Sequence, residues 1–251
     1  MEALVERTGS AAPSTGRRAW SGEGEDAPDR AADQPSPDGG PWLSRAVNFV
    51  LALLAVIVLL PVFLLIGLVV KLTSRGPIFY TQERVGLDRR ALGRADLNHR
   101  RRSDLGGQPF TIYKFRTMRV DAERDGVARW AAQADSRITP VGGFLRRTRI
   151  DEIPQIYNVL RGEMSFIGPR PERPTIVEQL RREIPFYDYR HAVKPGITGW
   201  AQINYSYGAS LEDARQKLKL DLYYIKNYSV ILDLLILMQT VRVVLWAQGS
   251  R

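Results

Sequence analysis

The longest uninterrupted apolar stretch of the chain is residues 46–70, in which Asn48 is the only strongly polar residue. A straight helix of this length measures about 37 Å, more than the roughly 30 Å hydrocarbon core of a bilayer. Pro61 lies well inside the stretch, where it removes a helical hydrogen bond and bends the helix. The pattern predicts a membrane helix that crosses the bilayer or dips in and returns. A buried helix of a soluble protein is the remaining alternative.

Shorter apolar patterns follow this stretch. Residues 78–82 and 110–115 are strand-like, and the polar insertion between them, with His99 and a basic cluster at 100–102, is typical of a solvated loop. Residues 194–204 read as a turn-rich loop with Trp200 as an aromatic anchor. The charges of Asp233 and Arg242 argue against a second membrane span in the last helix, which we expect in the headgroup plane or packed on the first membrane segment. Helices are predicted at 140–148, 152–160, 174–189 with an interruption near Pro185, 211–224 and 230–246.

Residues 1–41 show no apolar period and are rich in Gly, Ala, Ser, Pro and acidic residues. This composition predicts a disordered tail. No apolar core follows the first residues, so the tail does not read as a signal peptide.

Composition narrows the chemistry. The chain has no Cys, which excludes disulfides, thiolate nucleophiles and Cys-ligated zinc. It has two His, so a multi-histidine metal site or a Ser-His-Asp arrangement is not expected. The net charge of +9 indicates an anionic partner: nucleic acid, an anionic lipid surface or a phosphorylated substrate.

The densest group of candidate functional residues lies between 146 and 174. The adjacent carboxylates Asp151 and Glu152 stand between basic residues on both sides, namely Arg146, Arg147, Arg149, Arg161, Arg170 and Arg173. An acidic pair can hold a divalent cation while guanidinium groups bind phosphate oxygens in pairs. The simpler interpretation is that Asp151 is the N-cap of a helix from Glu152 to Leu160, which Gly162 ends. The two interpretations are compatible.

Lys114 and Arg116 end the second strand-like run, in the sequence YKFRTM. They either point into a pocket and bind phosphate there, or guard the edge of a strand with charge. The local sequence does not distinguish the two.

With these residues in view, the chain resembles the bacterial sugar transferases, the polyprenyl-phosphate hexose-1-phosphate transferases or small monotopic phosphoglycosyl transferases, over about residues 45–245. The motifs that carry the resemblance stand in a specific order: PIFYTQERVG, YKFRTM, RIDEIPQIYNVLRGEMSFIGPRP, VKPGITGWAQIN, and DLYYIKNYS followed by LDLLIL.

The resemblance implies a two-step reaction. An aspartate matching Asp151 attacks the sugar-bearing phosphorus of a UDP-sugar and expels UMP, and polyprenyl phosphate then takes the sugar phosphate from the aspartate. A covalent intermediate divides one difficult displacement between anions into two steps. Mg²⁺, with Mn²⁺ as the alternative ion, and arginines neutralise the charge that keeps the reactants apart.

The resemblance also implies roles for particular residues. Asp151 and Glu152 are the catalytic pair and the metal ligands, with Glu152 supporting Mg²⁺ binding or proton transfer. Pro61 matches a proline that breaks the membrane helix into a re-entrant hairpin. Lys114, Arg146, Arg170 and Asp221 match positions of the family's site, and together with Arg116, Arg149 and Lys194 they form our predicted substrate and phosphate binders.

The predicted architecture is a helix-dominated α+β monotopic membrane protein with a re-entrant N-terminal hairpin, a small β-hairpin and interfacial amphipathic helices. We expect a tail at 1–41, a membrane helix at 42–73 and a catalytic domain at 74–251 on the cytoplasmic face of the bacterial inner membrane. The expected partners are a UDP-sugar, polyprenyl phosphate and membrane lipids, without nucleic acid. A homodimer is compatible with the sequence.

The chain departs from the family pattern in two places. Leu60 stands where a Ser commonly precedes the proline, and YSYGAS follows Asn204 where many relatives have an Asn-Gly-Arg-Asn type of loop. The second departure resembles the branch that serves exopolysaccharide assembly and leaves the identity of the sugar open. Three further functions compete with phosphosugar transfer: a membrane-tethered nucleic-acid-binding protein, a glycosyltransferase that releases UDP instead of UMP, and a scaffold for polymer assembly.

Overall fold

The computed structural model describes residues 41–88, 105–120, 122, 135–205, 208 and 210–245, with side chains between 45 and 242 of those ranges. All but the last residue of the predicted tail, together with His99 and the basic cluster at 100–102, lie outside the described residues. The described part is a helix-dominated α+β fold with two small two-stranded sheets, which confirms the predicted class.

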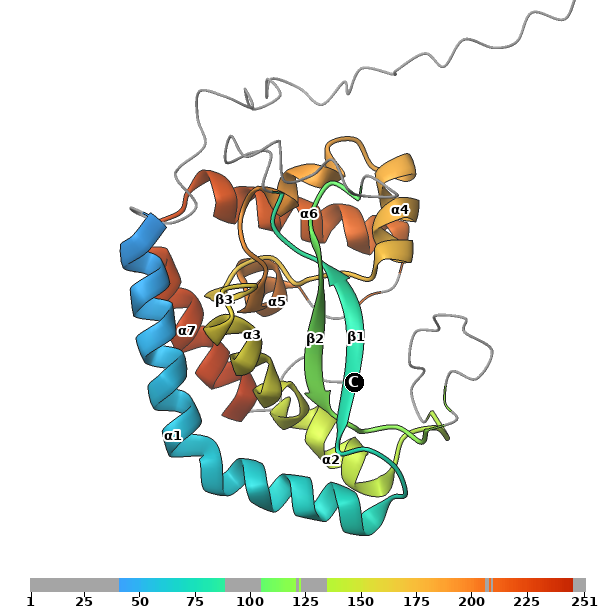
Figure 1. Cartoon of the computed structure of the whole chain (residues 1–251). Coiled ribbons are helices and arrows are strands. Elements are labelled where there is room, and N and C mark those ends of the chain that lie inside the picture. Colours follow the sequence, from blue (N-terminus) through green and yellow to red (C-terminus); the bar gives the residue numbers. More distant parts are fainter. Residues whose placement is uncertain are drawn as a thin grey trace, which may run out of the picture.

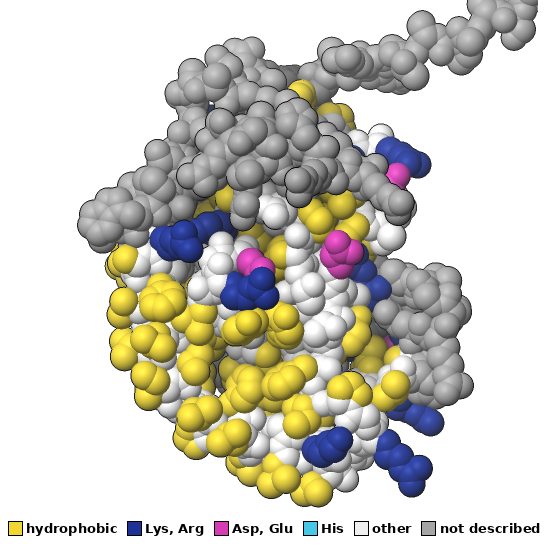
Figure 2. All heavy atoms as spheres, in the orientation of Figure 1, with side chains coloured by type: hydrophobic (Ala, Val, Ile, Leu, Met, Phe, Trp, Pro, Cys, Tyr) yellow, Lys and Arg dark blue, Asp and Glu magenta, His cyan; other side chains and the backbone are white. Residues whose placement is uncertain are grey.

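Helix α1 (Pro41–Thr73) is the long apolar helix that the hydrophobic pattern predicts. Pro61 lies in its interior, and Figure 1 shows α1 bending sharply near its middle, as expected where a proline removes a helical hydrogen bond. Of the helices in the described part of the chain, it is the one long and apolar enough to cross a membrane. Most of its side chains are exposed, and Figure 2 shows them as a band of hydrophobic groups along the rim of the molecule.

Strands β1 (Phe79–Val85) and β2 (Pro109–Phe115) form an antiparallel hairpin in which Phe79 is paired with Phe115 and Val85 with Pro109. The two predicted strands are confirmed, and β1 continues three residues beyond its predicted end. Phe63 of α1 packs on both strand ends, with its ring centroid 5.6 Å from that of Phe79 and 4.9 Å from that of Phe115. This aromatic cluster attaches the part of α1 that follows Pro61 to the hairpin.

Helix α2 (Pro140–Arg147) is capped by Thr139, whose side chain accepts a hydrogen bond from the Gly142 N–H, so the predicted helix is confirmed. The 3₁₀-helix η3 (Ile150–Gln155) and α3 (Ile156–Leu160) follow directly. The interpretation of Asp151 as an N-cap is wrong: Arg149 occupies the cap position with a φ of 55°, and Asp151 lies inside η3. Gly162, with a φ of 74°, follows the end of α3 as predicted.

The second sheet was not predicted. Strand β3 (Ser165–Ile167) pairs in parallel with β4 (Gly196–Thr198), and α5 (Trp200–Asn204) follows β4. The interpretation of 194–204 as a turn-rich loop is therefore wrong for the residues of β4 and α5, which form regular structure. Gly168 and Gly196 allow this pairing, because a Cβ at Gly196 would lie 2.1 Å from the Gly168 nitrogen.

The remaining helices of the described chain lie between residues 174 and 245. Helix α4 (Pro174–Glu183) ends before Pro185, where the predicted helix was interrupted, and is followed by the 3₁₀-helix η4 (Tyr187–Ala192). Helices α6 (Leu211–Lys226) and α7 (Val230–Leu245) are confirmed within two residues of their predicted ends. Asp233 of α7 accepts a hydrogen bond from the Tyr224 hydroxyl of α6 at 2.9 Å, so this charge faces the domain.

Candidate active site

Asp151 and Glu152 are carried by the first turn of η3, which packs against β2. Both are buried, with 8% and 7% of their surfaces exposed. The left-handed conformation of Arg149 immediately before them is rare for a residue with a side chain and costs free energy that the surrounding structure must supply. It turns the chain out of α2 so that the two carboxylates face β2. The local geometry thus places an acidic pair in a site largely removed from water.

Glu152 is neutralised by two cations from distant parts of the chain. Its Oε1 atom lies 2.6 Å from Lys114 Nζ and 2.6 Å from an Arg170 nitrogen, and the second Arg170 nitrogen is 3.2 Å from Oε2. Burial by itself raises the pKa of Glu152, but Arg170 and Lys114 outweigh burial and hold that pKa well below its usual range. Glu152 is therefore a permanent anion that orients two cations.

Asp151 has a different environment. Within the described part of the chain, its carboxylate accepts no hydrogen bond and forms no ion pair shorter than 4.0 Å. Burial raises the pKa of Asp151 to about 6, and the neighbouring Glu152 charge adds to this effect, while Lys114, Arg170 and Arg146 oppose it. A buried carboxylate without hydrogen bonds is poorly stabilised as an anion, so the Asp151 carboxylate is less stabilised in its charged form than that of Glu152.

A second layer of residues holds the chain around Arg170. Arg84 of β1, which we did not single out from the sequence, donates to the Pro171 carbonyl at 3.0 Å and pairs with Glu172 at 3.5 Å. Arg84 belongs to the PIFYTQERVG motif. Its membership of that motif, just beyond a predicted strand, was the signal that could have marked it as a site residue. Gln202 lies 3.5 Å from Arg170 through its Oε1 atom. These contacts place β1, the 168–172 segment and α5 around one guanidinium group.

Asp221 lies behind this layer, without a direct contact to the acidic pair. Its carboxylate accepts a hydrogen bond from Arg190 at 2.9 Å, and the same Arg190 nitrogen donates to the Arg170 carbonyl at 2.9 Å. Arg190 also donates to the Tyr187 hydroxyl at 2.6 Å. Burial raises the pKa of Asp221 to about 6, against the opposing charge of Arg190. In this arrangement Asp221 supports the backbone of residue 170, a connection for which the sequence offered no signal.

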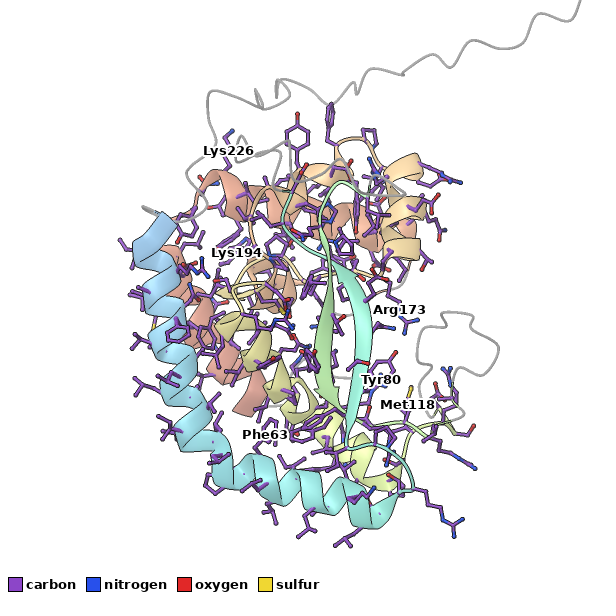
Figure 3. The ribbon with its side chains drawn as sticks, in the orientation of Figure 1. Phe63, Tyr80, Met118, Arg173, Lys194 and Lys226 are labelled. Carbon is purple, nitrogen blue, oxygen red and sulfur yellow. The ribbon has the colours of Figure 1, made fainter. Side chains whose placement is uncertain are left out.

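The other predicted phosphate binders lie in different places. Arg146 and Arg149 lie close enough to act on the acidic pair electrostatically. Arg116 bonds the carbonyl and hydroxyl of Ser74 just after α1, at 2.8 and 2.7 Å, and so lies against the membrane helix. The backbone carbonyl of Lys194 packs against Gly168. In Figure 3 Lys194 and Arg173 lie on opposite sides of the hairpin.

A cavity of about 50 Å³ lies beside Arg190 and Asp221, the two residues that support the Arg170 backbone. Tyr187, Arg190, Lys217 and Asp221 form part of its wall, and α4 closes it. Small-molecule sites usually measure about 300–1,000 Å³, so this cavity is too small for a nucleotide sugar in the present conformation.

No group of three or more His, Asp or Glu side chains that suits a metal ion occurs among the described residues. A Mg²⁺ ion does not need such a cage, because it is often bound by one or two carboxylates, substrate phosphates and waters. The Asp151 carboxylate fits that role, whereas both oxygens of Glu152 are engaged by cations. The site is therefore compatible with a magnesium ion held by Asp151 and a bound diphosphate.

Comparison with known proteins agrees with this site. Residues 40–247 match the family described as bacterial sugar transferase. The chain is 43% identical over 210 residues to a UDP-N-acetylgalactosamine-undecaprenyl-phosphate N-acetylgalactosaminephosphotransferase of Aeromonas hydrophila, and this alignment covers 84% of the chain and 45% of the relative. It is 43% identical over 211 residues to a UDP-glucose:undecaprenyl-phosphate glucose-1-phosphate transferase of Escherichia coli, covering 83% and 41%.

A third relative is similar in length to the chain. The exopolysaccharide production protein PSS of Rhizobium leguminosarum is 36% identical over 208 residues, and the match covers 79% of the chain and 93% of the relative. The chain spans less than half the length of the first two relatives. The match along most of this chain confirms the resemblance drawn from the motifs. The chain therefore belongs to the bacterial sugar transferase family, whose relatives include named sugar-1-phosphate transferases.

Proposed function

We propose that this protein transfers a hexose-1-phosphate from a UDP-sugar to polyprenyl phosphate, with undecaprenyl phosphate as the acceptor and UMP as the released nucleotide. The observation that carries the proposal is the contrast within the acidic pair: Glu152 is neutralised by Lys114 and Arg170, whereas Asp151 is buried without a hydrogen bond from the described residues. The names of the relatives, which act on undecaprenyl phosphate, support the same acceptor.

In the first step an oxygen of ionised Asp151 attacks the sugar-bearing phosphorus of the donor. The bond from this phosphorus to the bridging oxygen breaks, and that oxygen leaves with UMP. In the second step an oxygen of polyprenyl phosphate attacks the phosphorus, and the bond to Asp151 breaks, which restores the carboxylate. The product is a polyprenyl diphosphosugar, and covalent catalysis of this kind replaces one demanding step by two easier ones.

The basic residues have distinct roles in this reaction. Lys114 and Arg170, oriented by Glu152, bind the phosphate oxygens whose charge opposes attack by a second anion. Arg146 and Arg149 add positive potential at the same place. Asp221 acts on the Arg170 backbone through Arg190. Asp151 and the donor's phosphates would hold a Mg²⁺ ion, which would supply further charge neutralisation.

The membrane supplies the acceptor and explains the exposed apolar helix. The bend of α1 at its middle and the proline inside it support a re-entrant hairpin that enters and leaves the same leaflet. The cationic site near the membrane supports placement on the cytoplasmic face of the bacterial inner membrane. The name of the PSS relative supports a role in exopolysaccharide production, and the other names, one glucose and one N-acetylgalactosamine, leave the sugar open.

The decisive experiment compares the wild-type protein with Asp151→Asn. Labelled UDP-sugar without lipid acceptor should produce UMP and a phosphosugar adduct on Asp151, which mass spectrometry of peptides detects. Asp151→Asn should lose both, because an amide is a far weaker nucleophile. Glu178→Gln, which removes an exposed carboxylate on α4, is the matched control and should keep wild-type activity. Turnover with acceptor but without any adduct would contradict the proposal, and release of UDP would favour a glycosyltransferase.

A further inference from the structure

Asn158 is the most completely buried polar residue of the described chain, with 0% of its surface exposed. It belongs to α3, seven residues after the reactive aspartate. Its side-chain nitrogen donates to the Thr111 carbonyl at 2.6 Å and to Glu163 Oε2 at 2.8 Å, and its side-chain oxygen accepts from the Tyr113 N–H at 3.3 Å. Two acceptors thus face the NH₂ group and one donor faces the oxygen, which determines the orientation of the amide.

The Asn158 amide takes the place of a missing strand at the open edge of the hairpin. One edge of β2 is paired with β1 along the whole strand. On the other edge, the Thr111 carbonyl and the Tyr113 N–H both bond to Asn158. A neighbouring strand would bond the same pair of groups, one carbonyl and the N–H two residues later. Glu163 holds the amide in place from the opposite side.

The hydrogen bonds of Asn158 join β2 to the η3–α3 segment. The distance between these two elements determines how the charged side chains of the site meet. Strand β2 carries Lys114, the residue after Tyr113, and η3 and α3 carry Glu152 and Asn158 as one continuous segment. The 2.6 Å contact between Lys114 Nζ and Glu152 Oε1 spans these two elements. A shift of β2 along α3 would break the Asn158 bonds and the Lys114 contact together.

We propose that Asn158 is a positioning residue, whose amide sets the register of β2 against α3 and thereby holds the Lys114 ammonium at Glu152 and over the phosphate site. The inference rests on the proposed function for its kinetic consequence, but the clamp itself is a property of the fold. A lateral error of one ångström at a catalytic group can cost about 100-fold in rate, which is the scale of effect expected here.

The kinetic test is a double-mutant cycle between Asn158 and Lys114, measured as UMP release. Asn158→Ala should lower kcat by about 100-fold, with a much smaller change in the KM for the donor. In a Lys114→Ala background the same change should cost less than about threefold, because the group it positions is gone. Equal losses in the two backgrounds would overturn the proposal, since a general loss of folding acts in both.

The structural test does not depend on activity. Hydrogen exchange of the Tyr113 amide should accelerate in Asn158→Ala, and unchanged exchange would overturn the clamp. If Asn158→Ala does not fold, Asn158→Asp takes its place, because it retains the volume and the acceptor for Tyr113 but cannot donate to Thr111. In Asn158→Asp, the loss of kcat should again be much smaller in the Lys114→Ala background, while the Tyr113 amide should stay protected from hydrogen exchange. Asn227→Ala, which loses one bond to the Tyr223 carbonyl at an exposed helix end, is the matched control and should leave rate and exchange unchanged.

If wild-type protein released no UMP, the proposed function would fail while the exchange experiment still tested the clamp. If UMP release were normal and the cycle additive, the clamp would fail and the proposed function would stand. The two sets of results are therefore separable.

Discussion

Asp151 and Glu152 are adjacent, equally buried carboxylates with opposite electrostatic surroundings. Glu152 is held by two cations, so its pKa lies below the usual range, although burial alone would raise it. Asp151 lacks such contacts, and its pKa rises to about 6. Because the Asp151 anion is the less stabilised of the two, this difference supports Asp151 rather than Glu152 as the proposed nucleophile.

The raised pKa of Asp151 predicts the pH dependence of the first half-reaction. Below about pH 6 the protonated form predominates in the free enzyme, so kcat/KM for UMP release should fall about tenfold per pH unit as the pH decreases. Glu152→Gln removes a negative neighbour and leaves Lys114 and Arg170 uncompensated, and both changes lower the Asp151 pKa. The acidic limb of the profile, measured on the residual activity, should therefore move to lower pH in this variant. A limb that stays in place or moves upward would contradict the assignment.

The candidate residues differ in how far the sequence alone could place them. The resemblance pointed to Lys114, Arg146 and Arg170, and the structure brings all three to the acidic pair, although their roles in binding remain predictions. Asp221 came from the resemblance and Arg116 from its place at the end of a strand-like run, yet their partners are Arg190 and Ser74. A residue type in a motif indicates what a side chain can bind, whereas its partner depends on which elements pack around it.

At the scale of elements, α1 and the η3–α3 segment show how local sequence acts on geometry. Pro61 bends α1, and the left-handed Arg149 turns the chain from α2 into η3. The parallel pairing of β3 with β4 had no counterpart in the sequence reading, because each strand has three residues and both lie among Gly and Pro residues. Strands this short have no detectable alternation, and they are stabilised by their pairing and by the packing of Ile167 in the core.

The bend of α1 predicts its topology in the membrane. If the helix re-enters, residue 10 and residue 219 lie on the same side, and Pro61→Leu should straighten the helix and move residue 10 across the bilayer. Because the chain has no Cys, single cysteines replacing Ser10 or Lys219 give a clean readout with a membrane-impermeant maleimide. Labelling of the two sites from opposite faces in protein that retains Pro61 would show that α1 crosses the membrane.

At the scale of the whole molecule, the exposed apolar surface extends beyond α1. Helix α7 buries Ile236 completely against the core, while Ile231, Leu234 and Met238 are exposed, Met238 by 67%. Asp233, one of the two charges that argue against a membrane span by α7, accepts a hydrogen bond from the Tyr224 hydroxyl. This division of faces is typical of a helix that lies in the membrane interface.

The position of α7 is testable with spin labels in vesicles. A nitroxide at Met238→Cys should be accessible to oxygen dissolved in the lipid and protected from a water-soluble nickel complex, because its side of the helix faces acyl chains. A nitroxide at Lys219→Cys, on the exposed surface of α6, is the matched control and should show the reverse. Equal accessibility of the two labels to the nickel complex would place α7 outside the membrane.

The sequence by itself determined the features that arise from neighbouring residues. These are the apolar helix with a proline at its middle, the two strands of the hairpin, the helix starting at Pro140, and an acidic pair among arginines. Periodicity, capping and proline geometry act within a few residues, so they can be recognised without a structure.

Only the tertiary structure decided which carboxylate is neutralised by cations and which has no hydrogen bond from the described residues. The partners of Glu152 are 38 and 18 residues away along the chain, and Asn158 bonds backbone groups 47 and 45 residues away. Burial and ion pairing at such separations follow from how the hairpin packs on η3 and α3, because the strength of a charge–charge contact depends on distance in space and on the exclusion of water.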